Sequence, residues 1–349
     1  MQEGRLEFLN AGYGTLVKTR LLEGGKLKAL IRLEAEREIF PDAITSIGIV
    51  LVANDGLNEP VRFYTVASVD ELPSLLLSEP KASVPISDLC ASDKWLKYFE
   101  SQPDFVDHGN LVSIREYGSF SRGIATGANE FFVLSPSRAK HLGIPRSALS
   151  RCIAKSNQVK QSVISDQDFE RLEEEDADVF LFDVKGNPSS SAKDYIQQGE
   201  SSGFHLRYLT KMRRPWYKVE NRAPAPLLFG VFSRGKFKVI RNHSSAVNLT
   251  CFHGFYPLIF GGPYIDRLFL YFQSEAARSI LSMSMRRYGD GLDKFEPNDL
   301  NHALAPSFAW FDRMPDDIVR LGMAACKSGS PYTQVLEDYF SQLLTEVVA

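Results

Sequence analysis

The segment from His205 to Arg241 reads HLRYLTKMRRPWYKVENRAPAPLLFGVFSRGKFKVIR. It carries ten lysine and arginine side chains against one acid, Glu220, so its local charge is 10 − 1 = +9 in a chain of net charge −3. Six aromatic side chains lie between the cations. Cations bind phosphate and release its counterions, and aromatic faces stack on bases. The segment therefore favours nucleic-acid binding, although basic runs also occur on solvated faces and alternating aromatics in strand cores.

Composition is typical of a soluble protein with room for two domains, since 44% of the 349 residues are hydrophobic and 24% are charged. No apolar run reaches the roughly 18 residues of a membrane span, and the amino terminus lacks the pattern of a secretory signal. We therefore expect a cytoplasmic protein without membrane contact. The four cysteines are far apart, and His205, His243 and His253 fit no ligand spacing, so neither a disulfide framework nor a metal site is expected.

An acidic run precedes the basic segment. From Asp166 to Asp178 eight acids stand against Arg171, a local balance of 1 − 8 = −7. The two runs cancel in the total, so a pI near 6.1 does not argue against a nucleic-acid face, because binding depends on local potential. The acidic run is expected to form a solvated loop or the edge of a helix.

The amino-terminal part follows an α/β pattern. The sequence predicts a helix from Asn10 to Leu22 and strands from Leu27 to Leu33, Ile44 to Ala53 and Val61 to Ala67. The second strand is nearly all apolar, as in a sheet covered on both faces. These elements are too few to close a doubly wound sheet, so they indicate part of a larger domain. Residues 78–93, rich in Ser and Pro, are predicted to be a linker.

A domain boundary is predicted near residues 100–110, which gives domains of 1–105 and 106–349. The second domain begins with a β-rich stretch. Its later elements are predicted to be a strand from Val179 to Val184, a hairpin from Leu227 to Ile240, a helix from Arg267 to Arg287 and a final helix from Thr333 to Val347. The hairpin would place Arg234, Lys236 and Lys238 on one face.

Several motifs occur together in one order. Ser121 to Phe132 reads SRGIATGANEFF, Tyr208 to Tyr217 reads YLTKMRRPWY, and Arg286 to Pro297 reads RRYGDGLDKFEP. Together they resemble the target-recognition domain of TaqI-like, site-specific adenine DNA methyltransferases, which are common in restriction–modification systems. Phe8 to Gly14, with the helix and strands that follow, resembles the end of that family's catalytic domain. The resemblance covers most of residues 8–300.

The resemblance implies an α/β remnant of a Rossmann-like methyltransferase domain, followed by a mixed α+β target-recognition domain. The complete enzyme would use S-adenosylmethionine on double-stranded DNA, and this chain would choose the sequence. The family's catalytic Asn/Asp-Pro-Pro-Tyr/Phe motif is missing: the nearest string is Asn187-Pro188-Ser189-Ser190, and no glycine-rich cofactor loop follows an early strand. We therefore expect no catalytic residue, no bound cofactor and no methyl transfer by this chain alone.

More than one kind of protein is compatible with these features. One alternative is a truncated or split methyltransferase, whose donor site lies on a separate chain. The other is a non-enzymatic specificity subunit similar to those of type I systems. A basic face that preferred RNA would instead indicate an RNA-binding module. Asp183 and Lys185 form a D-x-K pattern, and Pro103-Asp104 forms a PD pair, as in metal-dependent nucleases. Such enzymes need carboxylates that converge on one metal ion, and these two patterns are far apart in the sequence, so a nuclease is disfavoured.

The resemblance places Phe40 where the family stacks an aromatic side chain on the flipped adenine. The predicted DNA contacts come from the SRGIATGANEFF motif, the basic segment and the RRYGDGLDKFEP motif. They are Arg122, Thr126, Asn129, Arg213, Arg214, Trp216, Tyr217, Lys218, Arg234, Lys236, Lys238, Arg241, Arg286, Arg287 and Lys294. Of Trp216 and Tyr217, one is expected to be exposed for stacking and the other buried. Asn129 is equally compatible with a turn.

Overall fold

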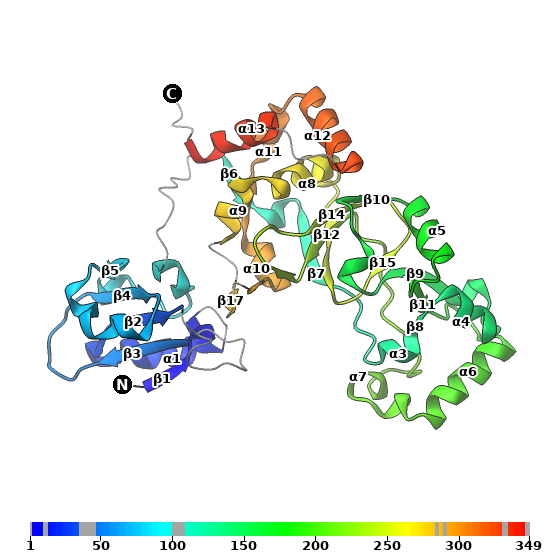
Figure 1. Cartoon of the computed structure of the whole chain (residues 1–349), viewed down its shortest axis with the longest axis horizontal. Coiled ribbons are helices and arrows are strands. Elements are labelled where there is room, and N and C mark those ends of the chain that lie inside the picture. The colour runs from blue at the N-terminus through cyan, green and yellow to red at the C-terminus, as the bar shows by residue number, and fades with distance from the viewer. Residues whose placement is uncertain are drawn as a thin grey trace. The chain divides into compact units, whose positions relative to one another are not determined.

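The computed structural model describes residues 2–9, 13–34, 47–99, 109–282, 286–288, 292–329 and 334–345. The chain forms two compact units (Figure 1). Unit 1 comprises residues 1–106, 232–235 and 279–295, and unit 2 comprises residues 107–231, 236–278 and 296–349. The predicted boundary at 105/106 lies outside the described residues. Two segments expected in the second domain, 232–235 and 279–295, belong to unit 1.

Unit 1 is built on a five-stranded mixed sheet with the order β1-β3-β2-β4-β5. The strands are β1 (Gln2–Arg5), β2 (Leu27–Leu33), β3 (Ile47–Val52), β4 (Val61–Val66) and β5 (Ala82–Val84). β2 and β4 run parallel, and the other neighbours in this sheet are antiparallel. The linker prediction is wrong for β5, because its main chain pairs with β4, with Val61 opposite Val84.

Apolar side chains cover both faces of this sheet, as predicted from its nearly continuous apolar strands. Ala29, Ile31 and Leu33 of β2 lie in one buried cluster, whereas Leu30 lies in another that contains Trp95. This alternation follows from the two-residue period of a strand. The first cluster includes Leu75 of the 3₁₀ helix η3 (Val69–Leu77), and the second includes residues of α1 (Gly14–Leu22) and η5 (Trp95–Phe99).

A second sheet of unit 1 joins segments that are distant in the sequence. It has the order β13-β18-β17, formed by β13 (Phe232–Ser233), β17 (Arg286–Tyr288) and β18 (Leu292–Lys294). The prediction of one helix from Arg267 to Arg287 is therefore wrong. The chain forms α8 (Ile265–Gln273), α9 (Glu275–Ser282) and then β17. The hydroxyl of Ser274 donates to the Tyr271 carbonyl at 2.7 Å and accepts from the Ala277 N–H at 3.2 Å, so this residue separates the two helices.

Unit 2 contains two larger sheets and a two-stranded one. The five-stranded sheet has the order β10-β14-β12-β16-β7, and the four-stranded sheet β15-β9-β11-β8. Their strands are β7 (Gly118–Arg122), β8 (Val133–Leu134), β9 (Leu149–Ile153), β10 (Val163–Ile164), β11 (Phe180–Phe182), β12 (Leu227–Gly230), β14 (Val239–Asn242), β15 (Val247–Asn248) and β16 (Phe252–Pro257). β6 (Leu111–Ser113) pairs with β19 (Leu304–Pro306). The predicted hairpin is confirmed between β12 and β14, where Leu228 lies opposite Ile240.

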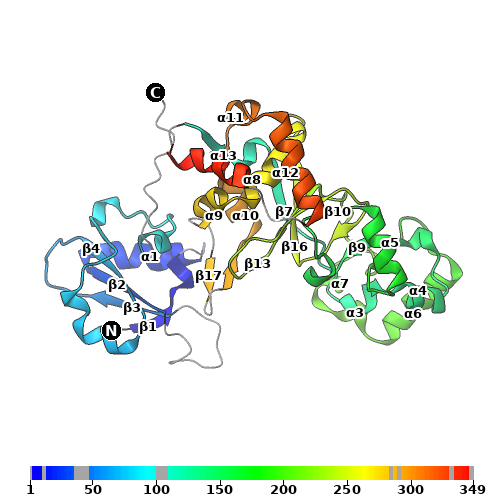
Figure 2. The same cartoon turned by 45° about the horizontal axis from the view of Figure 1, so that its top comes forward.

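Helices surround these sheets (Figure 2). They are α3 (Asn129–Phe132), α4 (Pro136–His141), α5 (Asp166–Glu174), α6 (Ser190–Ser201), α7 (Tyr208–Lys211), α8, α10 (Pro297–His302), α11 (Phe308–Asp312), α12 (Asp316–Ser328) and α13 (Gln334–Thr345). Phe131, Phe182 and Tyr195 are buried in one apolar core that joins α3, β11 and α6. This core fixes the position of the basic segment, because Trp216 packs against it.

Candidate nucleic-acid interface

The basic segment, residues 205–241, starts on a helical turn beside α3. α7 lies next to α3 in both views (Figure 1, Figure 2), and Arg207 forms an ion pair with Glu130 of α3 at 2.6 Å. Gly127 has a φ of +79°, and a Cβ there would lie 2.8 Å from the Cβ of Leu209. The loop 123–129 therefore needs glycine at this position to let α7 pack closely on it.

Arg213 holds this loop from inside the fold. Its guanidinium donates to the carbonyls of Ala125 and Thr126, the latter at 2.9 Å, and lies 5.8 Å from the Phe132 ring. Burial lowers the pKa of Arg213. Thr126 is only 2% exposed and hydrogen-bonds the side chain of Asn129. In this structure the Thr126 and Arg213 side chains are used by internal hydrogen bonds, and their role as DNA contacts stays a prediction. Asn129 itself is exposed.

Both aromatic residues of the Pro215-Trp216-Tyr217 stretch pack against the core of unit 2. Trp216 lies 5.0 Å from the Phe131 ring and donates from Nε1 to Glu200 at 2.9 Å. Tyr217 packs against the same core and is 6.2 Å from the Trp216 ring. The prediction that one of them is exposed for stacking is wrong, because both are half-buried against the core.

Carboxylates neutralise Arg222 and Arg241 of the basic segment and Arg122 outside it. Glu220 contacts Arg122 at 3.2 Å and Arg222 at 2.8 Å. Arg241 donates from Nε to Asp266 of α8 at 2.6 Å and also to the Pro226 carbonyl. Arg241 is thus held by an internal ion pair, and its role as a DNA contact stays a prediction. The Arg122 side chain stays more than half exposed.

The hairpin does not form a uniform basic ribbon. Lys238 is half-buried, donates to the Ser156 carbonyl at 2.5 Å and lies 5.8 Å from the Phe252 ring. Burial lowers the pKa of Lys238. Arg234 and Lys236 are exposed. The predicted single basic face is therefore wrong for Lys238, whose ammonium turns inward.

Between Phe204 and Val219, the exposed cations without a described carboxylate contact are Lys211, Arg214 and Lys218. Arg214 donates to the carbonyls of Lys211 and Arg213 at 2.7 and 2.8 Å, which keeps its charge at the end of α7. Close to them in the chain lie three exposed apolar side chains, Leu206, Tyr208 and Met212, which were not among the predicted DNA contacts. The available signal was their spacing, since Tyr208 and Met212 are four residues apart and share one face of the helical turn.

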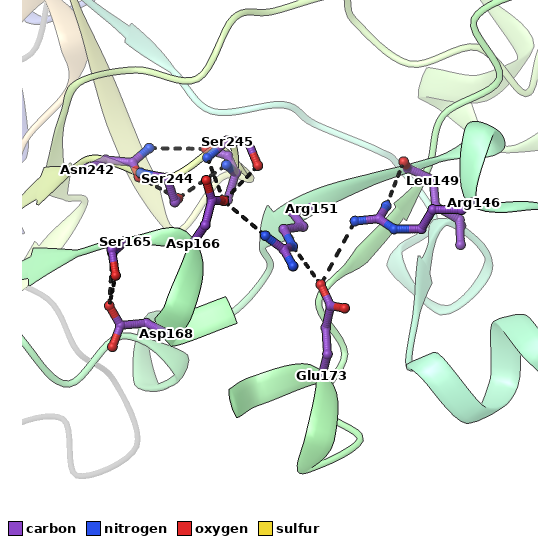
Figure 3. Close-up of polar contacts among 11 residues, drawn as sticks. Arg146, Leu149, Arg151, Ser165, Asp166, Asp168, Glu173, Asn242, Ser244 and Ser245 are labelled. Atoms are coloured by element: carbon purple, nitrogen blue, oxygen red, sulfur yellow. Dashed lines mark hydrogen bonds and ion pairs between the residues drawn. The ribbon is translucent and has the colours of Figure 1, made fainter. Parts of the chain in front are cut away.

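Carboxylates of the acidic run bind other side chains of unit 2. Figure 3 shows Arg151 between Asp166 and Glu173, with contacts of 3.0 and 2.6 Å. The N–H and hydroxyl of Ser245 both donate to Asp166, and the Ser245 backbone N–H is the main cause that lowers the pKa of this carboxyl. These bonds join α5 to β9 and to the turn after β14. At least these two carboxylates of the run therefore serve as internal partners.

The nuclease pattern forms an ordinary ion pair. Asp183 is buried, accepts from Ser150 at 2.8 Å and pairs with Lys185 at 2.7 Å. Within the described residues no group of three or more His, Cys, Asp or Glu side chains could hold a metal ion. Asp104 lies outside the described residues.

Some predicted contacts belong to unit 1 or are not described. Phe40 lies outside the described residues. The backbone of Arg286 and Arg287 forms β17, paired with β18, but their side chains are outside the described part of the chain. The ammonium of Lys294 lies 5.8 Å from the Phe232 ring. None of the helices in the described part of the chain is long and apolar enough to cross a bilayer.

Comparison with known proteins gives consistent results. The family model described as the C-terminal domain of type II methyltransferase M.Eco57I matches residues 92–343. Type II methyltransferase M.AccI of Acinetobacter calcoaceticus is 37% identical over 323 residues, which are 89% of this chain and 59% of that protein. Type II methyltransferase M.XamI of Xanthomonas campestris pv. amaranthicola is 24% identical over 302 residues, 86% of this chain and 55% of that protein. The chain thus spans more than half, but less than two-thirds, of the length of these relatives.

A solved structure shares the fold. The type IIL restriction-modification enzyme MmeI, determined in complex with DNA, superposes with a TM-score of 0.58 at 12% identity. The match covers 98% of this chain and 46% of that chain. At this identity the likeness establishes a similar mixed α/β fold.

Proposed function

Since the chain belongs to the family of the C-terminal domain of type II methyltransferase M.Eco57I, we propose that it recognises a specific sequence in double-stranded DNA. It does so as part of an S-adenosylmethionine-dependent, adenine-specific methyltransferase of a restriction–modification system. One observation carries the proposal. From Phe204 to Val219 every charged side chain is cationic, and three of these cations are exposed without a described carboxylate contact.

The chemistry of these three cations fits a DNA backbone. Lys211 and Lys218 act as point charges toward phosphate, whereas Arg214 can also hold a guanine edge through two parallel hydrogen bonds. Arg122 stays more than half exposed beside Glu220 and Arg222, so it adds a further cation that DNA can recruit. Arg213 acts indirectly, because it fixes the loop from which Asn129 reaches solvent. The DNA bound by MmeI in its solved complex supports the same ligand class for this fold.

We propose that the methyl donor is not held by the residues described in this chain. The sequence contains no Asn-Pro-Pro-Tyr motif. Gly14, at the start of α1, packs directly on the preceding backbone, because a Cβ there would lie 1.7 Å from the Phe8 carbonyl oxygen. We therefore assign donor binding to a part of the enzyme beyond this sequence, whether on a longer chain or on a separate methyltransferase chain.

Unit 1 fits the end of a Rossmann-like catalytic domain in this proposal. Its β2 and β4 are parallel and buried on both faces, as expected for such a sheet. Phe40 keeps its proposed role against the flipped adenine. The relatives are described as type II methyltransferases, which favours this proposal over a non-enzymatic specificity subunit.

Salt titration of DNA binding tests the proposal. Replacing Lys211, Arg214 and Lys218 by Gln should make the plot of log affinity against log salt shallower by about 0.9 for each phosphate that is no longer neutralised. Fluorescence anisotropy with duplex DNA measures this slope. A matched control replaces Lys140, Lys160 and Lys193 by Gln, which removes the same charge from exposed positions of unit 2 outside the basic segment. Equal slopes for both variants, or no salt-sensitive affinity for DNA, would contradict the proposal.

A further inference from the structure

An exposed apolar ridge lies within the basic segment. Leu206, Tyr208 and Met212 are 67%, 76% and 72% exposed. Large apolar side chains that are this exposed and close together in the chain mark an interaction surface more often than isolated ones do. The inference drawn from this ridge rests on the proposed function, because it concerns how the same surface meets DNA.

The ridge is held outward by the residues between its members. Thr210 is fully buried, and its hydroxyl donates to the Phe204 and Arg207 carbonyls, the latter at 3.1 Å. Leu209 packs against the loop at Gly127. Leu209 and Thr210 are thus turned into the fold. Tyr208, the first residue of α7, and Met212, the residue after its last, are four positions apart and face solvent on the same side. The outward direction is therefore built into the local packing.

The charges around the ridge select its partner. The ammonium of Lys211 lies 5.8 Å from the Tyr208 ring, and Arg214 lies just beyond Met212 in the chain. No acid occurs from Phe204 to Val219. An apolar protein surface would have to desolvate these cations without compensation, whereas DNA offers phosphates for them and a stack of bases for the apolar groups.

We propose that Leu206, Tyr208 and Met212 form a wedge that inserts between neighbouring bases of double-stranded DNA, while Lys211 and Arg214 hold the flanking phosphates. Apolar side chains that enter a base step partly unstack it and bend the duplex. Stacking of the Tyr208 ring on a base offsets part of the cost of separating the two bases. This cost is lower where a base is already unpaired. The wedge therefore predicts tighter binding to a duplex that contains one unpaired base than to the same duplex fully paired.

The test compares these two fluorescein-labelled duplexes by anisotropy, using the full chain and three variants. Wild type and Tyr208→Phe should bind the interrupted duplex about tenfold more tightly than the intact one. Tyr208→Ala should lose this preference. Phe260→Ala is the matched control, because Phe260 is 80% exposed in unit 2 but lies outside the basic segment. Phe260→Ala should keep the preference. Circular dichroism checks that each variant folds.

The outcomes separate the wedge from the proposed function. If wild type binds both duplexes with equal affinity, or if Tyr208→Ala keeps the full preference, DNA binding stands and the wedge is overturned. If Phe260→Ala loses the preference as Tyr208→Ala does, the local assignment to Tyr208 is overturned. If wild type binds neither duplex, the proposed function fails and the wedge fails with it.

Discussion

Replacing Arg213 by Met tests whether this residue stabilises the fold or contacts DNA. The change removes two hydrogen bonds from a partly buried guanidinium to the carbonyls of Ala125 and Thr126, while the Met side chain keeps most of the apolar stem over Phe132. Each charge-assisted bond contributes about 1–1.5 kcal/mol once solvent exposure is taken into account. We therefore expect a loss of about 2–3 kcal/mol in the free energy of unfolding.

Urea denaturation followed by tryptophan fluorescence measures this loss, since Trp216 lies in the same core. With a slope of about 2–3 kcal/mol per molar urea, the midpoint should fall by roughly 1 M. Arg115→Met is the control, because Arg115 is exposed in unit 2. If Arg213→Met unfolds at the wild-type midpoint but loses DNA affinity, Arg213 is a DNA contact and the structural role assigned to it is wrong.

Two further predictions concern other parts of unit 2. Asp166→Asn should cost about 1 kcal/mol of unfolding free energy at pH 7, because the carboxylate accepts from Arg151 and Ser245 while half of it faces solvent. The pKa of Asp166 is lowered in the folded state, so the stability difference between wild type and Asp166→Asn should shrink as pH falls below about 4. Glu170→Gln is the control and should show no loss of unfolding free energy at neutral pH. Gly261→Ala should destabilise by about 1–3 kcal/mol or more, since its Cβ would lie 1.8 Å from the Tyr117 carbonyl oxygen. Gly262→Ala, with open space at its Cβ, should melt like wild type, and equal melting of the two variants would argue against this packing.

The sequence predicted the elements whose burial is continuous. β2 has the predicted bounds, Leu27–Leu33, because apolar side chains on both faces leave little choice of structure. The break between α8 and α9 escaped prediction, since the apolar period continues across it and Ser274 alone separates the helices. β5 was not predicted, because three residues in a Ser/Pro-rich stretch carry almost no hydrophobic pattern of their own.

The candidate site could be predicted as a region but not residue by residue. A count of cations cannot show which of them are neutralised, because some of the partners are distant in the sequence. Asp266, the partner of Arg241, lies 25 residues further along the chain in α8. The carbonyls bound by Arg213 come from another loop. The exposed ridge at Tyr208 escaped because a sequence pattern cannot separate outward aromatics from core ones without knowing how α7 packs.

We propose that the exposed cations between Phe204 and Val219 face DNA. Acetylation of lysines with and without duplex DNA, read by mass spectrometry, tests it directly. Bound DNA should protect Lys211 and Lys218 and leave Lys140, Lys160 and Lys193 as reactive as before, because these three lie outside the basic segment. If DNA binds but Lys211 and Lys218 react unchanged while the other three are protected, another face of the molecule binds DNA and the claim is contradicted.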